Sequence, residues 1–123
     1  MECEVRKHIT QMTTEEKTLL NNYLKKNYKL NTHTKNRQKE KYIDTNLIHR
    51  AIQNGSIVEY HYKGNNRILV RGNTNENGIN VCCVLDIDNM EVVTVYDNEV
   101  KDKHYTLDKS KYRKNSDIKK MLN

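Results

Sequence analysis

Ser56-Ile-Val-Glu-Tyr-His-Tyr62-Lys-Gly-Asn-Asn-Arg67-Ile-Leu-Val-Arg71 is the stretch that decides the fold. Its two runs of β-branched and aromatic residues are separated by a short Gly/Asn turn, which is the pattern of a β-hairpin. Two further runs, Ile79–Leu85 and Glu91–Tyr96, flank Asp88-Asn89, which tolerate the positive φ of a tight turn. The sequence therefore predicts an antiparallel meander of four strands.

Two helices are predicted ahead of the meander. Thr13 and Glu16 have the spacing of a capping box, and the apolar residues that follow recur at helical spacing, which predicts a first helix from Thr14 to Tyr28. Asp44 or Thr45 caps a second helix, which stops at Asn54-Gly55. The predicted fold class is α+β, with two N-terminal helices followed by an antiparallel four-stranded meander.

The remaining segments carry weaker signals. Residues 1–11 are predicted as a strand or an ordered arm, residues 30–42 as a loop followed by a short helix, and Lys101–Leu107 as an edge strand. With 123 residues, the chain fits one domain. We expect it to consist of an N-terminal helical extension (1–30), an α+β core (31–107) and a basic tail (108–123).

Composition argues against several classes of protein. No apolar run approaches the ~20 residues that span a bilayer, and the N-terminus lacks the apolar centre of a signal peptide, so we expect a cytoplasmic protein without membrane contact. Cys3, Cys82 and Cys83 show no repeated spacing, which argues against a disulfide framework. Adjacent cysteines on a strand suit packing, and no histidine pair has metal-ligand spacing, so we expect neither metal nor cofactor.

The net charge of +6 is unevenly distributed. Residues 25–43 contain seven basic residues against Glu40 alone, whereas residues 76–108 contain eight carboxylates against two lysines. The tail from Lys109 onward is basic again. Such a bipolar chain suits a polyanion on one face and a basic partner on another. The alternative interpretation is that the lysines form an ordinary solvated surface.

Residues 33–96 resemble a known family. His33 and Arg37 precede a helix, Ala51-Ile-Gln-Asn-Gly-Ser-Ile-Val-Glu-Tyr60 leads from helix to strand, Arg67 and Arg71 lie on the next strand, and Val92-Val-Thr-Val-Tyr96 forms the last. This pattern is similar to domain-of-unknown-function group 4258, small bacterial and phage domains related by fold to ribonuclease toxins such as barnase, RelE-type toxins and some colicins. The resemblance implies a RelE/barnase-like fold and toxin-like action on RNA, with chemistry at His33, Arg37 and Thr94.

Cleavage of RNA without a metal needs proton-transfer groups for the 2′-hydroxyl and the leaving oxygen, and cations around the phosphate. His33 is the candidate acid or base, since an imidazole exchanges protons near neutral pH. Arg37, Arg67 and Arg71 are candidate phosphate ligands because guanidinium groups match phosphate oxygens. The alternatives are an exposed His33 without a role and arginines that pair with carboxylates of neighbouring strands, Glu59 or Glu91.

Other strand residues are predicted to contact RNA. Tyr60 and Tyr62 share one face of their strand, where their rings are placed to stack bases beside the arginines of the next strand. The alternative is that these rings cover the sheet, because alternation does not identify the buried face. His61 projects the opposite way and is interpreted as a structural histidine. The predicted RNA-binding residues are Lys35, Lys41, Tyr60, Tyr62, Arg67, Arg71 and Tyr96.

Two functions stay open. The first is a metal-independent endoribonuclease that uses the 2′-hydroxyl as nucleophile, or an inactive descendant that only binds RNA. The second is a non-enzymatic phage-type inhibitor that binds a host or defence macromolecule through its charged faces. RNA is the predicted partner in the first case, with an antitoxin or host target as the candidate protein partner.

Overall fold

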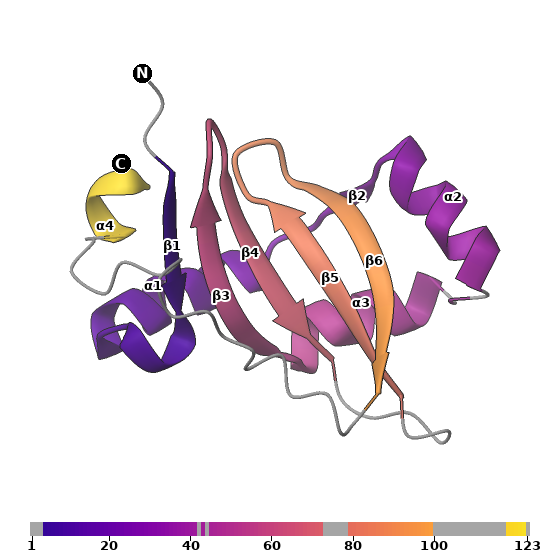
Figure 1. Cartoon of the computed structure of the whole chain (residues 1–123), viewed down its shortest axis with the longest axis horizontal. Helices are drawn as coiled ribbons and strands as arrows, with labels where there is room; N and C mark the ends of the chain where they lie inside the picture. The colour runs from indigo at the N-terminus through magenta and orange to yellow at the C-terminus, as the bar shows by residue number, and fades with distance from the viewer. Residues whose placement is uncertain (1–3, 42, 44, 73–78, 100–117, 123) are drawn as a thin grey trace.

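A computed structural model describes residues 4–41, 43, 45–72, 79–99 and 118–122. Within these residues the strands form one six-stranded sheet in the order β1-β3-β4-β5-β6-β2 (Figure 1). In chain order the elements are β1 (Val5–His8), a 3-10 turn (Ile9–Gln11), α1 (Thr14–Leu24), β2 (Lys29–Leu30), α2 (Thr32–Lys41), α3 (Thr45–Asn54), β3 (Ser56–Tyr62), β4 (Asn66–Arg71), β5 (Ile79–Asp86), β6 (Glu91–Glu99) and α4 (Ile118–Met121).

The predicted fold class is wrong, because the helices are interspersed among strands of a larger, mixed sheet. β1 joins the sheet from the N-terminus and pairs antiparallel with β3, with Val5 opposite Tyr62. β2 lies between α1 and α2 and pairs parallel with β6, with Leu30 opposite Val92. β1 lies in the segment predicted as a strand or an ordered arm, whereas β2, of two residues, is too short to show a periodic pattern.

The four strands β3 to β6 occur in sequence order, each antiparallel to the next. Gly64 takes the positive φ of the first turn, at 79°. In the turn between β5 and β6 the residue with positive φ is Met90, at 56°, and not Asp88 or Asn89 as predicted. The predicted edge strand at 101–107 lies outside the described residues.

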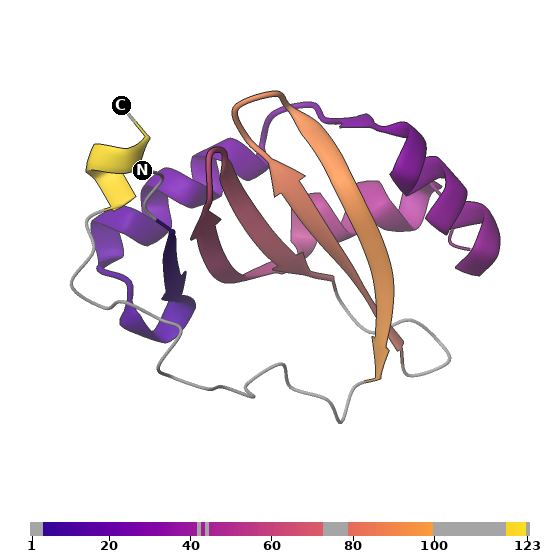
Figure 2. The ribbon, with the colours of Figure 1, turned by 45° about the horizontal axis from the view of Figure 1, so that its top comes forward.

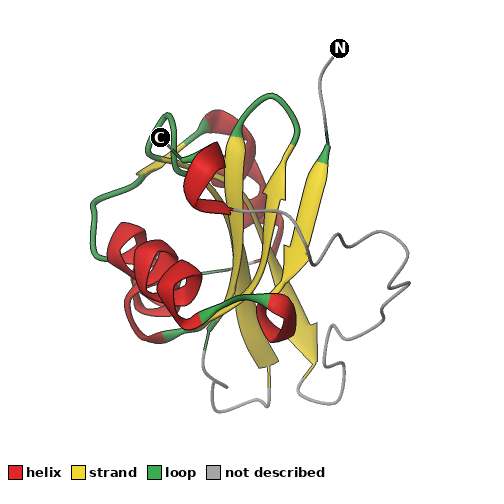
Figure 3. Cartoon of the chain, turned by 90° about the vertical axis from the view of Figure 1, so that its left-hand side faces the viewer, coloured by secondary structure: helices red, strands yellow, loops and turns green. Residues whose placement is uncertain are grey.

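The helices and the sheet form two layers, with α1 and α3 packed on one face of the sheet (Figures 2 and 3). α3 contributes Ile48, Ala51 and Ile52, all nearly inaccessible to solvent, and it packs across β4 and β5. The approach is close, because a Cβ atom on Gly72 would lie 2.7 Å from the Cβ of Ala51. The core lies between these layers. No helix of the described residues is long and apolar enough to cross a membrane.

α1 has the predicted start but an earlier end. The capping box is present, since the Glu16 backbone N–H donates to Thr13 Oγ1 at 3.2 Å and the Thr13 N–H donates to Glu16 Oε1 at 2.9 Å. The helix ends at Leu24 instead of Tyr28. Tyr28 is buried against the core, where its hydroxyl donates to the Tyr23 carbonyl at 2.8 Å and burial raises the pKa of Tyr28 to about 12. Tyr28 therefore continues the helical spacing of apolar residues in the sequence, although it lies outside the helix.

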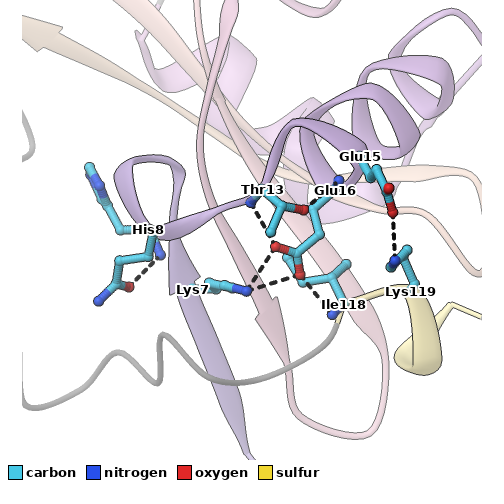
Figure 4. Close-up of polar contacts among 8 residues, drawn as sticks. Lys7, His8, Thr13, Glu15, Glu16, Ile118 and Lys119 are labelled. Atoms are coloured by element: carbon cyan, nitrogen blue, oxygen red, sulfur yellow. Dashed lines mark hydrogen bonds and ion pairs between the residues drawn. The ribbon is translucent and has the colours of Figure 1, made fainter.

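A buried ion pair joins β1, α1 and α4 (Figure 4). Lys7 Nζ donates to both carboxylate oxygens of Glu16, at 2.8 and 3.0 Å, and both residues are almost fully buried. The same carboxylate accepts the backbone N–H of Ile118 at 3.0 Å. Burial favours the neutral acid, but the hydrogen bonds from Lys7, Thr13 and Ile118 outweigh it and hold the pKa of Glu16 below its ordinary value of 4.5. Glu16 therefore links the two ends of the chain.

Glu16→Gln is expected to lower the free energy of unfolding by about 3 kcal/mol or more at neutral pH, because the substitution leaves the Lys7 charge buried without a counter-charge. Because the native pKa of Glu16 is depressed, this contribution is present at neutral pH and is lost as the pH falls below 4.5 through the native value. Urea unfolding of both proteins at several pH values measures the difference.

The matched control is Glu15→Gln, which removes the exposed ion pair between Glu15 and Lys119, 2.7 Å long. That pair is mostly solvated, so the control is expected to change stability by less than about 1 kcal/mol. If the two substitutions lower the free energy of unfolding equally, burial does not explain the contribution of the Lys7–Glu16 pair.

Candidate functional site

The face of the sheet away from α1 and α3 is rich in arginine and histidine. Along β4, Ile68 and Val70 are fully buried against the helices, so the alternate residues Arg67, Leu69 and Arg71 project to the other side. Strand register extends this alternation to the neighbouring strands. We call these side chains the arginine face: Arg6, His8, Glu59, His61, Arg67, Leu69, Arg71, Cys82, Val84, Thr94 and Tyr96.

The β1, β3 and β4 strands concentrate the charged groups of this face. His61 on β3 lies directly opposite Arg6 on β1 and Arg67 on β4. Glu59, two residues earlier on β3, lies opposite His8 and Leu69. Directly opposed residues have Cα atoms about 4.5–5.5 Å apart, so these side chains are neighbours.

Arg67 lacks the cross-strand partner that the sequence suggests for it. Its Nε is buried without a hydrogen bond, and among the described residues it forms no ion pair with Glu59 or Glu91. Asp86 lies opposite it on β5 but turns to its own hairpin, where Asp86 Oδ1 accepts the N–H of Asn89 at 3.0 Å. Among the described residues, the Arg67 guanidinium thus has no anionic partner.

Glu59 is the carboxylate at the centre of the arginine face. It is half-buried, and its Oε2 is inaccessible and accepts no hydrogen bond. Burial lowers the pKa of His8, and the negative charge of Glu59 opposes this shift. Burial also raises the pKa of Tyr96, and Cys82 and Glu59 raise it further. An unsatisfied buried acceptor costs about 1–3 kcal/mol, so Glu59 is an energetic liability in the fold.

His61 has a carboxylate partner at the end of the chain. Its Nε2 lies 2.8 Å from Glu4 Oε1, and the imidazole keeps 21% of its surface exposed. The hydrogen bond from His61, followed by the positive charges of His61, Lys63 and Arg6, lowers the pKa of Glu4 against the opposing effect of desolvation. The interpretation of His61 as a partnered histidine agrees with this contact, which lies at the arginine face.

Two of the three predicted catalytic residues, His33 and Thr94, are neighbours at the β6 edge of the sheet. α2 is held there because Thr34 Oγ1, fully buried, donates to the Val92 carbonyl at 2.6 Å. This contact places His33 Nε2 at 3.4 Å from Thr94 Oγ1. Arg37 follows one turn later on the same side of α2, and its Nε is buried without a hydrogen bond. His33 itself is exposed.

The predicted RNA-binding residues divide between the two faces of the sheet. Arg67, Arg71 and Tyr96 belong to the arginine face, and Lys35 is exposed on α2. Lys41 ends α2, and its side chain lies outside the described residues.

The structure corrects the prediction for the two tyrosines. Tyr60 is fully buried and hydrogen-bonded through its hydroxyl to Asn66 Oδ1, and Tyr62 packs against the core. Both rings lie on the helix side of the sheet, so they cannot stack bases beside Arg67 and Arg71. They cover the sheet, which is the alternative that the sequence left open.

Sequence reasoning missed Arg6, His8 and Glu59 as members of a site. Arg6 and His8 belong to β1, whose four residues carry no strand pattern strong enough to place them beside β3. Glu59 and His61 did carry a signal, because they alternate with the two tyrosines and must share the opposite face. Among the described residues, no cluster of histidine, cysteine or acidic side chains could hold a metal ion.

The fold and the arginine face define a small two-layer domain with a basic, histidine-bearing sheet surface. Residues 30–97, more than half of the chain, match the family described as "Domain of unknown function (DUF4258)". The chain belongs to this family. The matched segment runs from β2 to β6 and contains α2 and most of the arginine face, whereas β1, with Arg6 and His8, lies outside it. Comparisons with curated proteins and with solved structures gave no match.

Thr34→Val is expected to lower the free energy of unfolding by about 0.5–1.5 kcal/mol, because the Val92 carbonyl loses the shorter of its two hydrogen bonds and keeps the one from the Asn31 N–H. The substitution should also increase hydrogen exchange in α2, since Thr34 holds the helix on β6. Thr32→Val, at an exposed position of the same helix, is the matched control and should change stability by less than about 0.5 kcal/mol. Unchanged exchange in Thr34→Val would show that other contacts hold α2.

Proposed function

We propose that this domain engages RNA across the arginine face and cleaves it without a metal ion, through attack of the 2′-hydroxyl on the adjacent phosphate. The observation that carries the proposal is the unpaired guanidinium of Arg67 beside the imidazole of His61 and the carboxylate of Glu59. Cations for the phosphate and groups for proton transfer are the two requirements of this chemistry.

The width of the arginine face is the second argument for an RNA substrate. The arginine face runs across five strands, from β1 to β6, and neighbouring strands lie about 4.8 Å apart. A track of this width fits several nucleotides, with Arg6 and Arg67 at one side and Arg37 and Lys35 at the α2 edge. A cytoplasmic location and a toxin-like role, both predicted from the sequence, belong to this proposal.

His33 is the proton-transfer group that the sequence predicts, and its contact with Thr94 on β6 supports a role for it at that edge of the proposed RNA surface. In the alternative function, an inhibitor that binds a host or defence protein, the same charged surface contacts a protein. A stable stoichiometric complex with such a protein, together with intact and unbound RNA, would favour that alternative.

Arg67→Ala is expected to weaken binding of a single-stranded RNA oligonucleotide about tenfold or more, because a charged hydrogen-bond donor to phosphate is lost. Fluorescence anisotropy at several salt concentrations measures the affinity. The slope of log K against log salt should fall by about 0.7 when one phosphate contact to a single strand is removed.

The matched control is Arg50→Ala, which removes the same charge from an exposed position on α3, on the helix side of the sheet. It should leave the salt slope within about 0.2 of the wild-type value. If both substitutions reduce affinity and slope equally, RNA binding reflects net charge alone and the arginine face is not the binding surface.

A further inference from the structure

Acid and base catalysis on one phosphodiester needs two proton-transfer groups within reach of the same phosphate. His33 lies beyond β6, three strands away from Glu59 on β3. That separation is roughly 14 Å at the usual spacing between strands. Among the described residues, no carboxylate forms an ion pair or hydrogen bond with His33. Glu59 and His61, both on β3, meet the requirement for two proton-transfer groups near one phosphate more closely.

Glu59 and His61 have the spacing that this reaction needs. They are two residues apart on one strand and share the arginine face, so their Cα atoms are about 7 Å apart. When a phosphodiester lies between them, the 2′-hydroxyl of the adjacent ribose can contact the Glu59 carboxylate, and the 5′-oxygen can contact the His61 imidazole. Glu59 Oε2 is inaccessible, but among the described residues the Glu59 carboxylate forms no hydrogen bond or ion pair, so its other oxygen, Oε1, is not occupied by a donor.

The neighbours of the pair match the charges that develop in the reaction. The contact with Glu4 orients the imidazole of His61 through Nε2, which leaves Nδ1 for the substrate. Arg6 and Arg67 lie on either side of His61 in register, where their guanidinium groups can hold the non-bridging oxygens of the phosphate. Leu69, opposite Glu59, is apolar and half-buried.

We infer that Glu59 and His61 are the catalytic base and acid of this domain, with Arg67 as the phosphate ligand, an inference that rests on the proposed cleavage of RNA. Glu59 Oε1, the carboxylate oxygen that is not buried, accepts the proton of the 2′-hydroxyl, and the bond from O2′ to phosphorus forms. The bond from phosphorus to O5′ breaks, and protonated His61 donates its proton to O5′. The products are a 2′,3′-cyclic phosphate and a 5′-hydroxyl end. His33 then contributes an RNA contact at the β6 edge.

The experiment compares Glu59→Gln, His61→Gln and His33→Ala with the wild-type protein. Each is incubated in EDTA with a labelled RNA oligonucleotide and with the DNA oligonucleotide of the same sequence, and products are separated on a denaturing gel. The controls are Glu15→Gln and His49→Gln, at exposed positions on the helices. Thermal unfolding of each variant identifies loss of folding.

The expected result is cleavage of RNA but not DNA by the wild type, with cyclic phosphate ends. Glu59→Gln and His61→Gln should each lower the rate at least a hundredfold while they still bind RNA. His33→Ala should lower the rate less than tenfold, and the two controls should match the wild type.

Two other outcomes are distinguishable. If His33→Ala abolishes cleavage and Glu59→Gln retains it in a folded protein, the assignment to Glu59 and His61 is overturned while the proposed ribonuclease function stands. If the wild type leaves RNA intact, both proposals fail as statements about catalysis, and RNA binding is judged by the anisotropy comparison of Arg67→Ala with Arg50→Ala.

Discussion

The buried ion pair between Lys7 and Glu16 is the constraint on which the arrangement of this domain depends. Side chains alternate along a strand, so the inward position of Lys7 places Arg6 and His8 on the arginine face. A slip of β1 by one residue would bury Arg6 and expose Lys7. The contact that anchors α1 and α4 therefore also determines which β1 side chains reach the candidate site (Figure 4).

An ion pair is a costly way to hold a strand, because an apolar pair of similar volume is often equally stable. Our interpretation is that it provides register, which apolar contacts specify poorly over four residues. The Glu16 carboxylate accepts hydrogen bonds from Lys7 and from the backbone N–H groups of Thr13 and Ile118. These three bonds form together only when β1, α1 and α4 are in this one arrangement. At the other edge of the sheet, hydrogen bonds also hold the neighbouring elements: β2 pairs with β6, and Thr34 of α2 donates to the Val92 carbonyl.

Polar groups are treated differently in the two regions of the sheet. At the hairpin ends, Asn66 and Asp88 are paired with each other, and Asp86 accepts hydrogen bonds from the turn that it begins. On the arginine face, Arg67 Nε and Glu59 Oε2 have no hydrogen bond. Stable folds leave few buried polar atoms unsatisfied, so these two atoms distinguish the arginine face from the hairpin ends.

The sequence by itself determined the local elements: the four strands from Ser56, the capping box at Thr13, and the helix that stops at Asn54. Each of these depends on residues close together in the chain, where turn chemistry and periodicity act. Only the tertiary structure decided that Tyr60 is buried, that β1 and β2 complete a mixed sheet, and that Arg6 and His8 lie beside Glu59 and His61. These facts depend on which face the helices cover and on pairings between distant segments, and a pattern with period two is the same for either face.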